Sequence, residues 1–435
     1  MRMLPLAAAT YFMVSGGPYG IEDILTAGYF KGLIILLALP LLWSLPTALM
    51  IGELASALPE EGGFYIWVRR AMGPFWGYQE AWLSLAASIF DMAIYPTLFV
   101  LYLGTLAPTW TAGWHGLAWE LVLIAACCVW NLLGAPAVGD GSMGLFVILL
   151  APFVVLVGYA AIRGAHLHHA EMFTAPGTHA GITTAILVAM WNFMGWDNAS
   201  TVAREVDRPQ KSYPRAMLLS TAIVTVSYVI PLAAMAWARV PVEQFSTGSW
   251  AEVARSMAGE WLGIAIVVGG TVTSLGMFNA LTMSYARLPM ALAEDGLLPR
   301  VLARRNGRGV PWVAVLACAV AWALALRFSF ERLISIDLIL YGASLILEFV
   351  ALVVLRLREP SLERPFRAGN LAVTCVIAAV PSALIFYAMY ASRHERMAGM
   401  PALALGGLIA AVGPIGYLIS KSVWSRSRPK VAVGD

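Results

Sequence analysis

The sequence predicts an all-α integral membrane protein with about twelve transmembrane helices. Of its 435 residues, 60% are hydrophobic and only 12% are charged, whereas a water-soluble domain carries about twice that share of charged residues. Apolar stretches long enough to span a bilayer, about 20 residues each, recur along the whole chain. Little sequence remains for a soluble domain, so we expect a single membrane domain over residues 1–435.

The apolar stretches place the predicted spans, with boundaries uncertain by a few residues. The spans are 6–28, 32–57, 72–106, 117–134, 141–163, 181–202, 213–238, 260–286, 311–329, 333–355, 371–391 and 399–420. The third is longer than one crossing requires, so we expect it to be tilted or to extend past the bilayer.

The positions of lysine and arginine predict the orientation, because cytoplasmic segments carry an excess of both. If the N-terminus lies inside and the spans alternate, 20 of the 28 Lys and Arg residues fall inside and 8 fall outside. The bias predicts an even number of spans in a cell membrane, with both termini on the cytoplasmic side.

Two of the predicted helices are interrupted at corresponding places. The first breaks within Ser15-Gly16-Gly17-Pro18-Tyr19-Gly20 and the sixth near Asn192–Asp197, and glycine and proline weaken helices. A simple proline kink is the alternative for the first break alone. Breaks in helices 1 and 6 favour two inverted five-helix repeats, with a binding site between them at the midplane. The repeats would span about 6–163 and 181–355, with peripheral helices over about 371–420.

Acidic residues inside the predicted spans are candidates for function, because an unpaired charge in the bilayer costs several kcal/mol. These acids are Glu22, Asp23, Glu53, Asp91, Asp197, Asp337 and Glu348. Basic residues are almost absent at the same depth. Acids without basic partners indicate an external cation, which is a proton, a metal ion or a cationic substrate.

Several of these acids have a structural alternative. Glu53 lies at the predicted cytoplasmic end of its helix and is expected to pair with Arg69 or Arg70. Asp197 either caps the restarted helix 6 or contacts substrate. Asp337 is expected near the outer end of its helix, in contact with solvent. Asp91 and Tyr95 are four residues apart and share one helix face.

Other classes of site find little support. The four cysteines lie in apolar stretches without metal spacing, and the histidines of His166-Leu167-His168-His169 lack a fixed set of partners. No hydrolase or phosphate-binding motif is present. We therefore expect no enzymatic activity, no metal site, no cofactor and no nucleic-acid partner.

Several ordered motifs carry a resemblance to a known family. They are Val14–Asp23, Pro59-Glu60-Glu61-Gly62-Gly63 with Gly73-Pro74-Phe75-Trp76-Gly77, Asp91–Pro96, Trp196–Thr201 with Glu205–Pro209, and Leu340-Tyr341-Gly342 with Leu347-Glu348-Phe349 and Arg364-Pro365-Phe366. Over nearly its whole length the chain resembles the amino acid–polyamine–organocation superfamily. The likeness is greatest to the polyamine uptake transporters of plants and protozoa, within the L-type amino acid transporter branch.

The resemblance implies a LeuT-type fold, alternating access and, for most such importers, proton symport. It also implies that substrate contacts the unwound parts of helices 1 and 6 and side chains of helices 3, 8 and 10. Together with the aromatic Tyr19, whose face could hold an amine, the predicted substrate-binding residues are Gly16, Gly17, Tyr19, Glu22, Asp91, Tyr95, Trp196, Asp197 and Glu348. Further aromatic candidates near the breaks are Trp191 and Tyr285.

Departures from the family pattern favour a purely cationic substrate. A Gly-Ser-Gly signature that holds an amino-acid carboxylate in many relatives reads Ser15-Gly16-Gly17-Pro18 here, and proline removes one donor. Helix 5 also has no lysine, which replaces sodium in some proton-coupled relatives. We therefore predict import of polyamines, with the proton as coupling ion. Asp91 with Asp197, and Glu22 with Glu348, are the predicted poles for two amines.

An inner gate and two alternative functions complete the predictions. Arg69 and Arg70 with Glu205 and Asp207 are predicted to pair at the cytoplasmic side and to form the gate. An amino acid permease of the same fold is the first alternative, and a substrate sensor that does not transport is the second. The expected partners are the lipid bilayer and a small-molecule substrate, which is a cation or an amino acid. A disulfide-linked heavy chain is not expected, because the loop Ala107–Gly116 has no cysteine.

Overall fold

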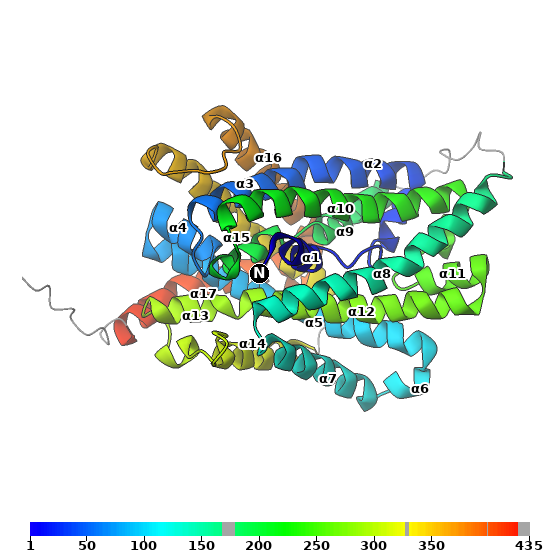
Figure 1. Cartoon of the computed structure of the whole chain (residues 1–435), viewed down its shortest axis with the longest axis horizontal. Helices are drawn as coiled ribbons and strands as arrows, with labels where there is room; N and C mark the ends of the chain where they lie inside the picture. The colour runs from blue at the N-terminus through cyan, green and yellow to red at the C-terminus, as the bar shows by residue number, and fades with distance from the viewer. Residues whose placement is uncertain (168–178, 327–329, 398, 425–435) are drawn as a thin grey trace, which may run out of the picture.

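The computed structural model describes residues 1–167, 179–326, 330–397 and 399–424 and is almost entirely helical. Its first half contains α1 (Met3–Val14), η1 (Glu22–Ala27), α2 (Tyr29–Leu39), η2 (Pro40–Ser44), α3 (Leu45–Ala57), α4 (Phe64–Met72), α5 (Pro74–Leu106), α6 (Pro108–Thr111), α7 (Trp114–Asn131), α8 (Ala135–Gly164), α9 (His179–Asn192), η3 (Trp196–Thr201) and η4 (Ala203–Glu205). The long helices run along the longest axis of the molecule (Figure 1).

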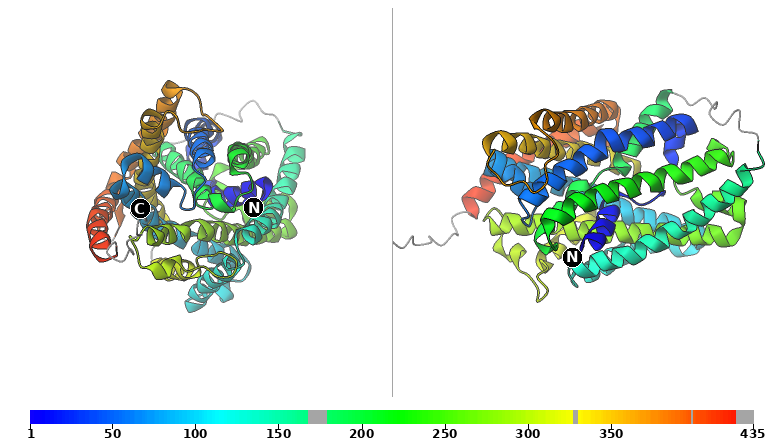
Figure 2. Two further views of the ribbon diagram at one scale, coloured as in Figure 1. Left: turned by 60° about the vertical axis from the view of Figure 1, so that its left-hand side comes forward. Right: turned by 45° about the horizontal axis from the view of Figure 1, so that its top comes forward.

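The second half contains α10 (Pro209–Trp237), η5 (Val242–Gln244), α11 (Trp250–Ala258), α12 (Glu260–Tyr285), α13 (Arg287–Glu294), η6 (Arg300–Ala303), α14 (Trp312–Ala325), α15 (Phe330–Arg358), α16 (Leu371–Ala391), η7 (Ser392–His394), β1 (Arg396–Met397), β2 (Met400–Pro401) and α17 (Ala402–Val423). The two short strands pair antiparallel. Figure 2 shows α1 inside the bundle and α16 and α17 at its periphery, where the sequence places the last two helices.

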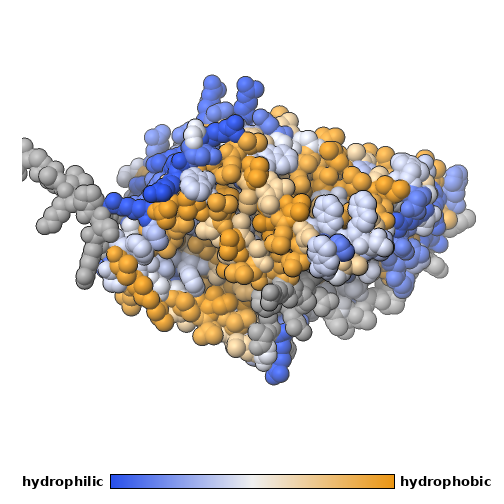
Figure 3. Space-filling view, turned by 90° about the horizontal axis from the view of Figure 1, so that it is seen from below, coloured by the Kyte–Doolittle hydropathy of each residue, from blue (hydrophilic) through white to orange (hydrophobic). Residues whose placement is uncertain are grey.

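The surface identifies a multi-pass membrane protein. Within the described residues, eight helices are long and apolar enough to cross a bilayer, and Met3–Val14 and Trp312–Ala325 are shorter apolar helices. Hydrophobic residues cover the middle of the molecule, and hydrophilic residues gather towards its two ends (Figure 3). Such a belt is the surface that contacts lipid tails, because the hydrocarbon core solvates apolar side chains.

Both predicted helix breaks are confirmed. The α1 helix ends at Val14 and η1 begins only at Glu22, while α9 ends at Asn192 and η3 begins at Trp196. Gly17 has a φ of 67° and Gly195 a φ of 89°, a backbone region that L side chains rarely adopt and glycine adopts freely. The predicted long third span is also confirmed, since α5 has 33 residues and is therefore about 50 Å long.

Short helices at the two ends of the bundle were not predicted. Helices α4 and α13 lie at one end, and α6 and α11 lie at the other (Figure 1). They are too short to span a bilayer, so a search for long apolar stretches passes over them. We call the end with α4 and α13 the arginine-rich end, because Arg69, Arg70, Arg287, Arg305 and Arg356 lie there. The end with α6 and α11 is the opposite end.

Candidate functional site

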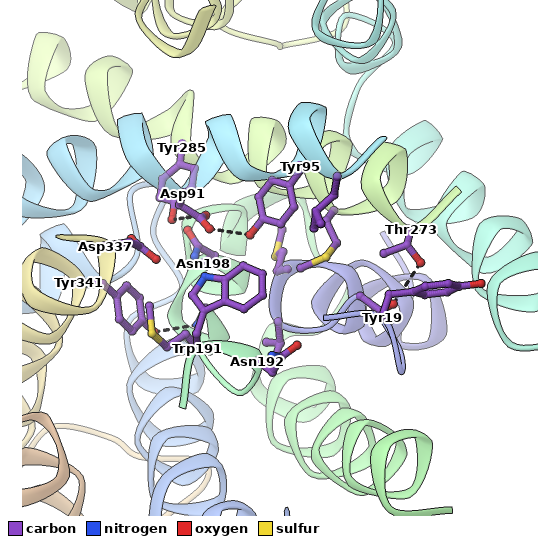
Figure 4. A pocket seen from close by; sticks show the side chains of 17 residues that line it. Tyr19, Asp91, Tyr95, Trp191, Asn192, Asn198, Thr273, Tyr285, Asp337 and Tyr341 are labelled. Carbon is purple, nitrogen blue, oxygen red and sulfur yellow. Dashed lines mark hydrogen bonds between the residues drawn. The ribbon is translucent and has the colours of Figure 1, made fainter. Parts of the chain in front are cut away.

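A small cavity lies where the two broken helices meet. The residues that line it are Met13, Val14, Gly16, Tyr19, Asp91, Tyr95, Leu98, Trp191, Asn192, Met194, Gly195, Asn198, Thr273, Met277, Tyr285, Asp337 and Tyr341 (Figure 4). The volume of the cavity is about 20 Å³, and it accommodates little more than one water molecule. An organic molecule therefore enters only when the surrounding helices move.

Side chains from other helices bind the backbone that the breaks set free. In helix 1, the carbonyl of Gly16 accepts from the Thr273 hydroxyl (3.1 Å), and that of Pro18 accepts from the Trp250 indole (2.6 Å). In helix 6, the carbonyl of Phe193 accepts from Trp43 (2.9 Å). Backbone groups freed inside a bilayer need such partners, so the protein itself stabilises both unwound segments.

Two glycines let the unwound segments pack closely. A Cβ on Gly195 would lie 2.3 Å from the carbonyl oxygen of Met13, and one on Gly16 would lie 2.8 Å from the Thr273 side chain. Both distances are below any real contact of a Cβ atom. Gly195 therefore brings the break of helix 6 against helix 1, and Gly16 brings the break of helix 1 against α12.

Two carboxylates from different helices reach the cavity. Asp91 of α5 accepts hydrogen bonds from the hydroxyls of Tyr95 (2.6 Å) and Tyr285 (3.4 Å). Asp337 of α15 is 2% exposed and lies within electrostatic reach of Asp91, as Figure 4 illustrates. Its Oδ2 atom has no hydrogen-bond partner within the described part of the chain. The expectation that Asp337 is solvated is therefore wrong.

Tyr341 connects the break of helix 6 to α15. Its hydroxyl accepts from the backbone N–H of Gly195 (2.9 Å) and donates to Oδ1 of Asp197. Gly195, and not Asp197, is the residue before η3. The carboxylate of Asp197 reaches the backbone N–H groups of Asp197 and Asn198 at the start of η3, so it helps to hold that end of the helix, and it does not line the cavity.

The structure brings together part of the predicted site. Gly16, Tyr19, Asp91 and Tyr95 line the cavity, as do the two aromatic candidates Trp191 and Tyr285. Five predicted residues do not line it: Gly17, Glu22, Trp196, Asp197 and Glu348. The φ of Gly17 makes the turn of the break, and Trp196 is fully buried away from the cavity.

Glu22 lies towards the opposite end and binds the loop before α11. Its Oε1 atom accepts from the backbone N–H of Gly248 (3.0 Å) and from the hydroxyl of Tyr102 (3.5 Å). The adjacent Asp23 accepts from Thr247 of the same loop (2.8 Å). Glu348 is within electrostatic reach of a different set, Asp197 and Glu80. Glu22 and Glu348 therefore do not form the predicted pole.

The four predicted gate residues lie at the arginine-rich end, but they do not pair with one another. Their partners are Asp295 for Arg69, Glu359 for Arg70, Arg287 for Glu205 and the terminal amine of Met1 for Asp207. The predicted pairing is wrong in this conformation, because helices α13 and α15 supply nearer partners than the loop after η3.

Glu53 is also paired differently from the prediction. Its carboxylate binds Arg356 and lies 3.3 Å from the guanidinium of Arg364, and it accepts from the backbone N–H of Ala368 (2.9 Å). Glu53 is fully buried. It therefore joins α3 to the end of α15 and the segment that follows, and neither Arg69 nor Arg70 takes part.

The predicted substrate-binding set omitted three functional candidates: Asp337, which was expected to be solvated, Tyr341 and Glu80. Tyr341 appeared only within a motif, and Glu80 of α5 was passed over although it is fully buried. A signal existed for two of them. Asp337 precedes Glu348 by eleven residues, and Glu80 precedes Asp91 by eleven, which is three helical turns and therefore one helix face.

The fold and the site, together with the permease family and the relatives reported below, define a membrane transporter with a small-molecule substrate. The structure matches the crystal structure of MhsT in complex with L-phenylalanine, with a TM-score of 0.67 and 13% identity over 90% of this chain and 98% of the other. The match confirms the LeuT-type fold, whereas the boundaries of the two repeats stay a prediction.

The sequence comparisons identify the family. The model of the amino acid permease family matches residues 8–409, so the chain belongs to that family. The chain is 31% identical to Polyamine transporter RMV1 of Arabidopsis thaliana, over 93% of this chain and 84% of that protein. It is 32% identical to Polyamine transporter PUT1 of Oryza sativa subsp. japonica, over 98% and 80%. The resemblance to the polyamine branch of the superfamily is thereby confirmed.

Proposed function

We propose that the protein imports polyamines, linear organic cations such as putrescine and spermidine, by proton symport with alternating access. One observation carries the proposal. The cavity holds the carboxylates of Asp91 and Asp337, and none of its lining residues in the described part of the chain is lysine, arginine or histidine. A protonated amine supplies the missing positive charge, and the faces of Tyr95, Trp191 and Tyr285 suit a cation with a methylene chain.

The scarcity of free backbone N–H groups at the break of helix 1 argues against an amino acid as the main substrate. An α-carboxylate needs several N–H groups at the end of a half-helix. The N–H of Gly17 already donates to the hydroxyl of Ser15 (3.0 Å), and Pro18 has no N–H. Two relatives whose names describe polyamine transporters support the same choice.

The arginine-rich end is the proposed inner gate. It faces the cytoplasmic side of a cell membrane, because Lys and Arg gather on that side. Its ion pairs Arg69–Asp295 and Arg287–Glu205 join α4 and η4 to α13 and the residue after it. Opening the gate separates these pairs, and the hydrogen bonds of Glu22 to the Gly248 loop hold the opposite end closed meanwhile. Both termini then lie in the cytoplasm.

The test is uptake of labelled putrescine, leucine and arginine into proteoliposomes, with and without an inward proton gradient. We expect saturable putrescine uptake that the gradient increases and that unlabelled spermidine inhibits. Saturable leucine uptake, with neither uptake of putrescine nor inhibition by it, would overturn the polyamine substrate. Tight putrescine binding without uptake under any gradient would identify the sensor instead.

A further inference from the structure

Helices α5 and α15 pack side by side and carry matching polar faces. On α5 the face consists of Glu80, Ser84, Ser88 and Asp91, and on α15 of Asp337, Tyr341, Ser344 and Glu348. Each face begins and ends with an acid, and the two acids are eleven residues apart, about 16 Å along the helix. Asp91 is within electrostatic reach of Asp337 at one end, and Glu80 of Glu348 at the other.

The deeper pair, Glu80 and Glu348, has no role in the site described so far. Both side chains are fully buried. One oxygen of Glu80 accepts from the hydroxyl of Ser84 (2.8 Å). The other oxygen of Glu80 and both oxygens of Glu348 have no hydrogen-bond partner among the described residues. Three buried, unpartnered carboxylate oxygens on facing helices are a rare and costly arrangement.

The charges on the neighbouring elements do not compensate for this pair. On α4, Arg69 and Arg70 bind Asp295 and Glu359. At the end of α15, Arg356 and Arg364 bind Glu53 of α3. The other ionisable groups within electrostatic reach of the pair are Asp197 of η3 and Tyr341 of α15, and neither adds a positive charge.

Two acids in such surroundings cannot both be ionised. A buried carboxylate without a partner costs several kcal/mol, and like charges in one site force at least one acid to keep its proton. A metal ion is a poor alternative, since Ca²⁺ takes about six to eight oxygen ligands, and the described residues contain no cluster of three or more His, Cys, Asp or Glu side chains placed to hold a metal. A proton needs one oxygen only.

We propose that Glu80 and Glu348 form the binding site of the coupled proton, three helical turns from the substrate cavity on the side of the arginine-rich end. The inference rests on the proposed function and adds the location of its coupling ion. A carboxylate of the pair takes a proton from water in one conformation, forming an O–H bond, and returns that proton to water in the other. Asp197 and Tyr341 lie between this site and Asp91 and Asp337.

This location explains how substrate and proton influence each other without sharing a site. Asp197 is within electrostatic reach of both Glu80 and Glu348. It also accepts a hydrogen bond from the hydroxyl of Tyr341, and Tyr341 lines the cavity. An amine bound beside Asp91 and Asp337 adds positive charge near Asp197. A proton on Glu348 removes negative charge from the other side of Asp197, so movement of either cation changes the affinity for the other.

The test separates exchange from accumulation in proteoliposomes. The variants are Glu348→Gln and Glu80→Gln, and Glu363→Gln, an exposed acid after α15, is the matched control. We measure exchange of labelled putrescine at equal pH, accumulation under an inward proton gradient, and putrescine-induced proton entry with a pH-sensitive dye inside the vesicles. Glutamine keeps the size of glutamate and cannot exchange a proton.

We expect Glu348→Gln to exchange putrescine within about threefold of the wild-type rate and to lose accumulation and proton entry by about tenfold or more. Wild-type accumulation and proton entry in both glutamine variants would overturn the proposal. So would loss of spermidine binding with putrescine binding unchanged, because the pair would then hold an amine of a longer substrate. If a glutamine variant does not fold, Glu348→Asp keeps a carboxyl group and must shift the pH dependence of accumulation; an unshifted profile contradicts the proposal.

Failure of the proposed function looks different. If the wild-type protein transports putrescine without any proton entry, proton symport itself is wrong. If the wild-type protein couples the two and the variants do so equally well, only the assignment to Glu80 and Glu348 is wrong.

Discussion

The acids at the arginine-rich end and the acids in the middle of the bundle are wholly or largely buried but have opposite partners. Near the end, Glu53, Glu61 and Glu205 each bind an arginine. In the middle, the described side-chain partners of Asp91 and Asp197 are tyrosine hydroxyls, and Glu348 has none. The first group is neutralised by the protein itself, and under the proposed function the second group takes its positive charge from substrate and proton.

Under the proposed function, the difference separates structural acids from acids that serve transport. An acid with a buried arginine cannot be removed without leaving that arginine uncompensated, which is expensive. Replacing an acid that has no basic partner by its amide costs the protein little stability, because burial of that acid was itself unfavourable. Substitutions in the first group should therefore change folding, and substitutions in the second should change uptake.

The largest effect is expected for Glu53→Ala. The substitution leaves Arg356 and Arg364 buried near each other without their carboxylate, at a cost of about 3–5 kcal/mol in the free energy of unfolding. Thermal unfolding of the purified protein should show a large fall in melting temperature, or the folded yield should collapse. Glu363→Ala, at an exposed position of the same end, is the control. A melting temperature equal to that of the control would show that the acids bound to arginine do not stabilise the fold.

A large effect on uptake, without one on folding, is expected for Asp91→Asn. The amide keeps the shape, accepts from one tyrosine hydroxyl and can donate to the other, but it removes the charge that faces an amine. Because hydrogen bonds to charged groups contribute about 1.5–3 kcal/mol, uptake efficiency should fall by about tenfold or more. Size-exclusion profiles and melting temperature should stay those of the wild type. Unchanged uptake kinetics would make Asp91 a structural acid.

A smaller effect is expected for Tyr341→Phe. The variant loses the hydroxyl that joins the N–H of Gly195 to Asp197, and leaving a buried donor unsatisfied costs about 1–3 kcal/mol. We expect a fewfold to tenfold loss of putrescine uptake together with a modest loss of thermal stability. Tyr390→Phe, on the exposed side of α16, controls for removal of a hydroxyl. If both variants behave alike, Tyr341 does not connect the two helices energetically.

The smallest effect is expected for the exposed pair Arg70–Glu359. Three hydrogen bonds from the Arg70 guanidinium (3.0, 3.1 and 2.7 Å) hold the pKa of Glu359 below its usual range. The pair therefore contributes its stability above the ordinary carboxyl pKa and loses it as the pH falls through the lowered value. Since exposed pairs contribute about 0–1 kcal/mol, Glu359→Gln should barely change the melting temperature at neutral pH. A fall as large as that of Glu53→Ala would contradict the distinction between buried and exposed pairs.

The predicted site shows where sequence reasoning succeeds. Gly16, Tyr19, Asp91 and Tyr95 belong to segments whose local composition already marks them, a glycine-rich break and an acid in an apolar helix. Glu22 and Trp196 belong to the same kind of segment, yet they lie away from the cavity. The direction of a side chain beside an unwound segment depends on the turn that the backbone makes there, and the pattern of residue types does not specify that turn.

The sequence alone determines the spans, the two breaks, the family and the scarcity of basic residues beside the buried acids. These properties depend on apolar length, on glycine and proline, and on charge, all of which act locally. Only the tertiary structure decides which acid receives an arginine, since Glu53 and Arg356 are 303 positions apart and Arg70 and Glu359 are 289 apart. It likewise aligns α5 with α15 and so places Glu80 beside Glu348. Pairing over such separations follows from how the helices pack, because a charge is neutralised by whichever group packing brings nearest.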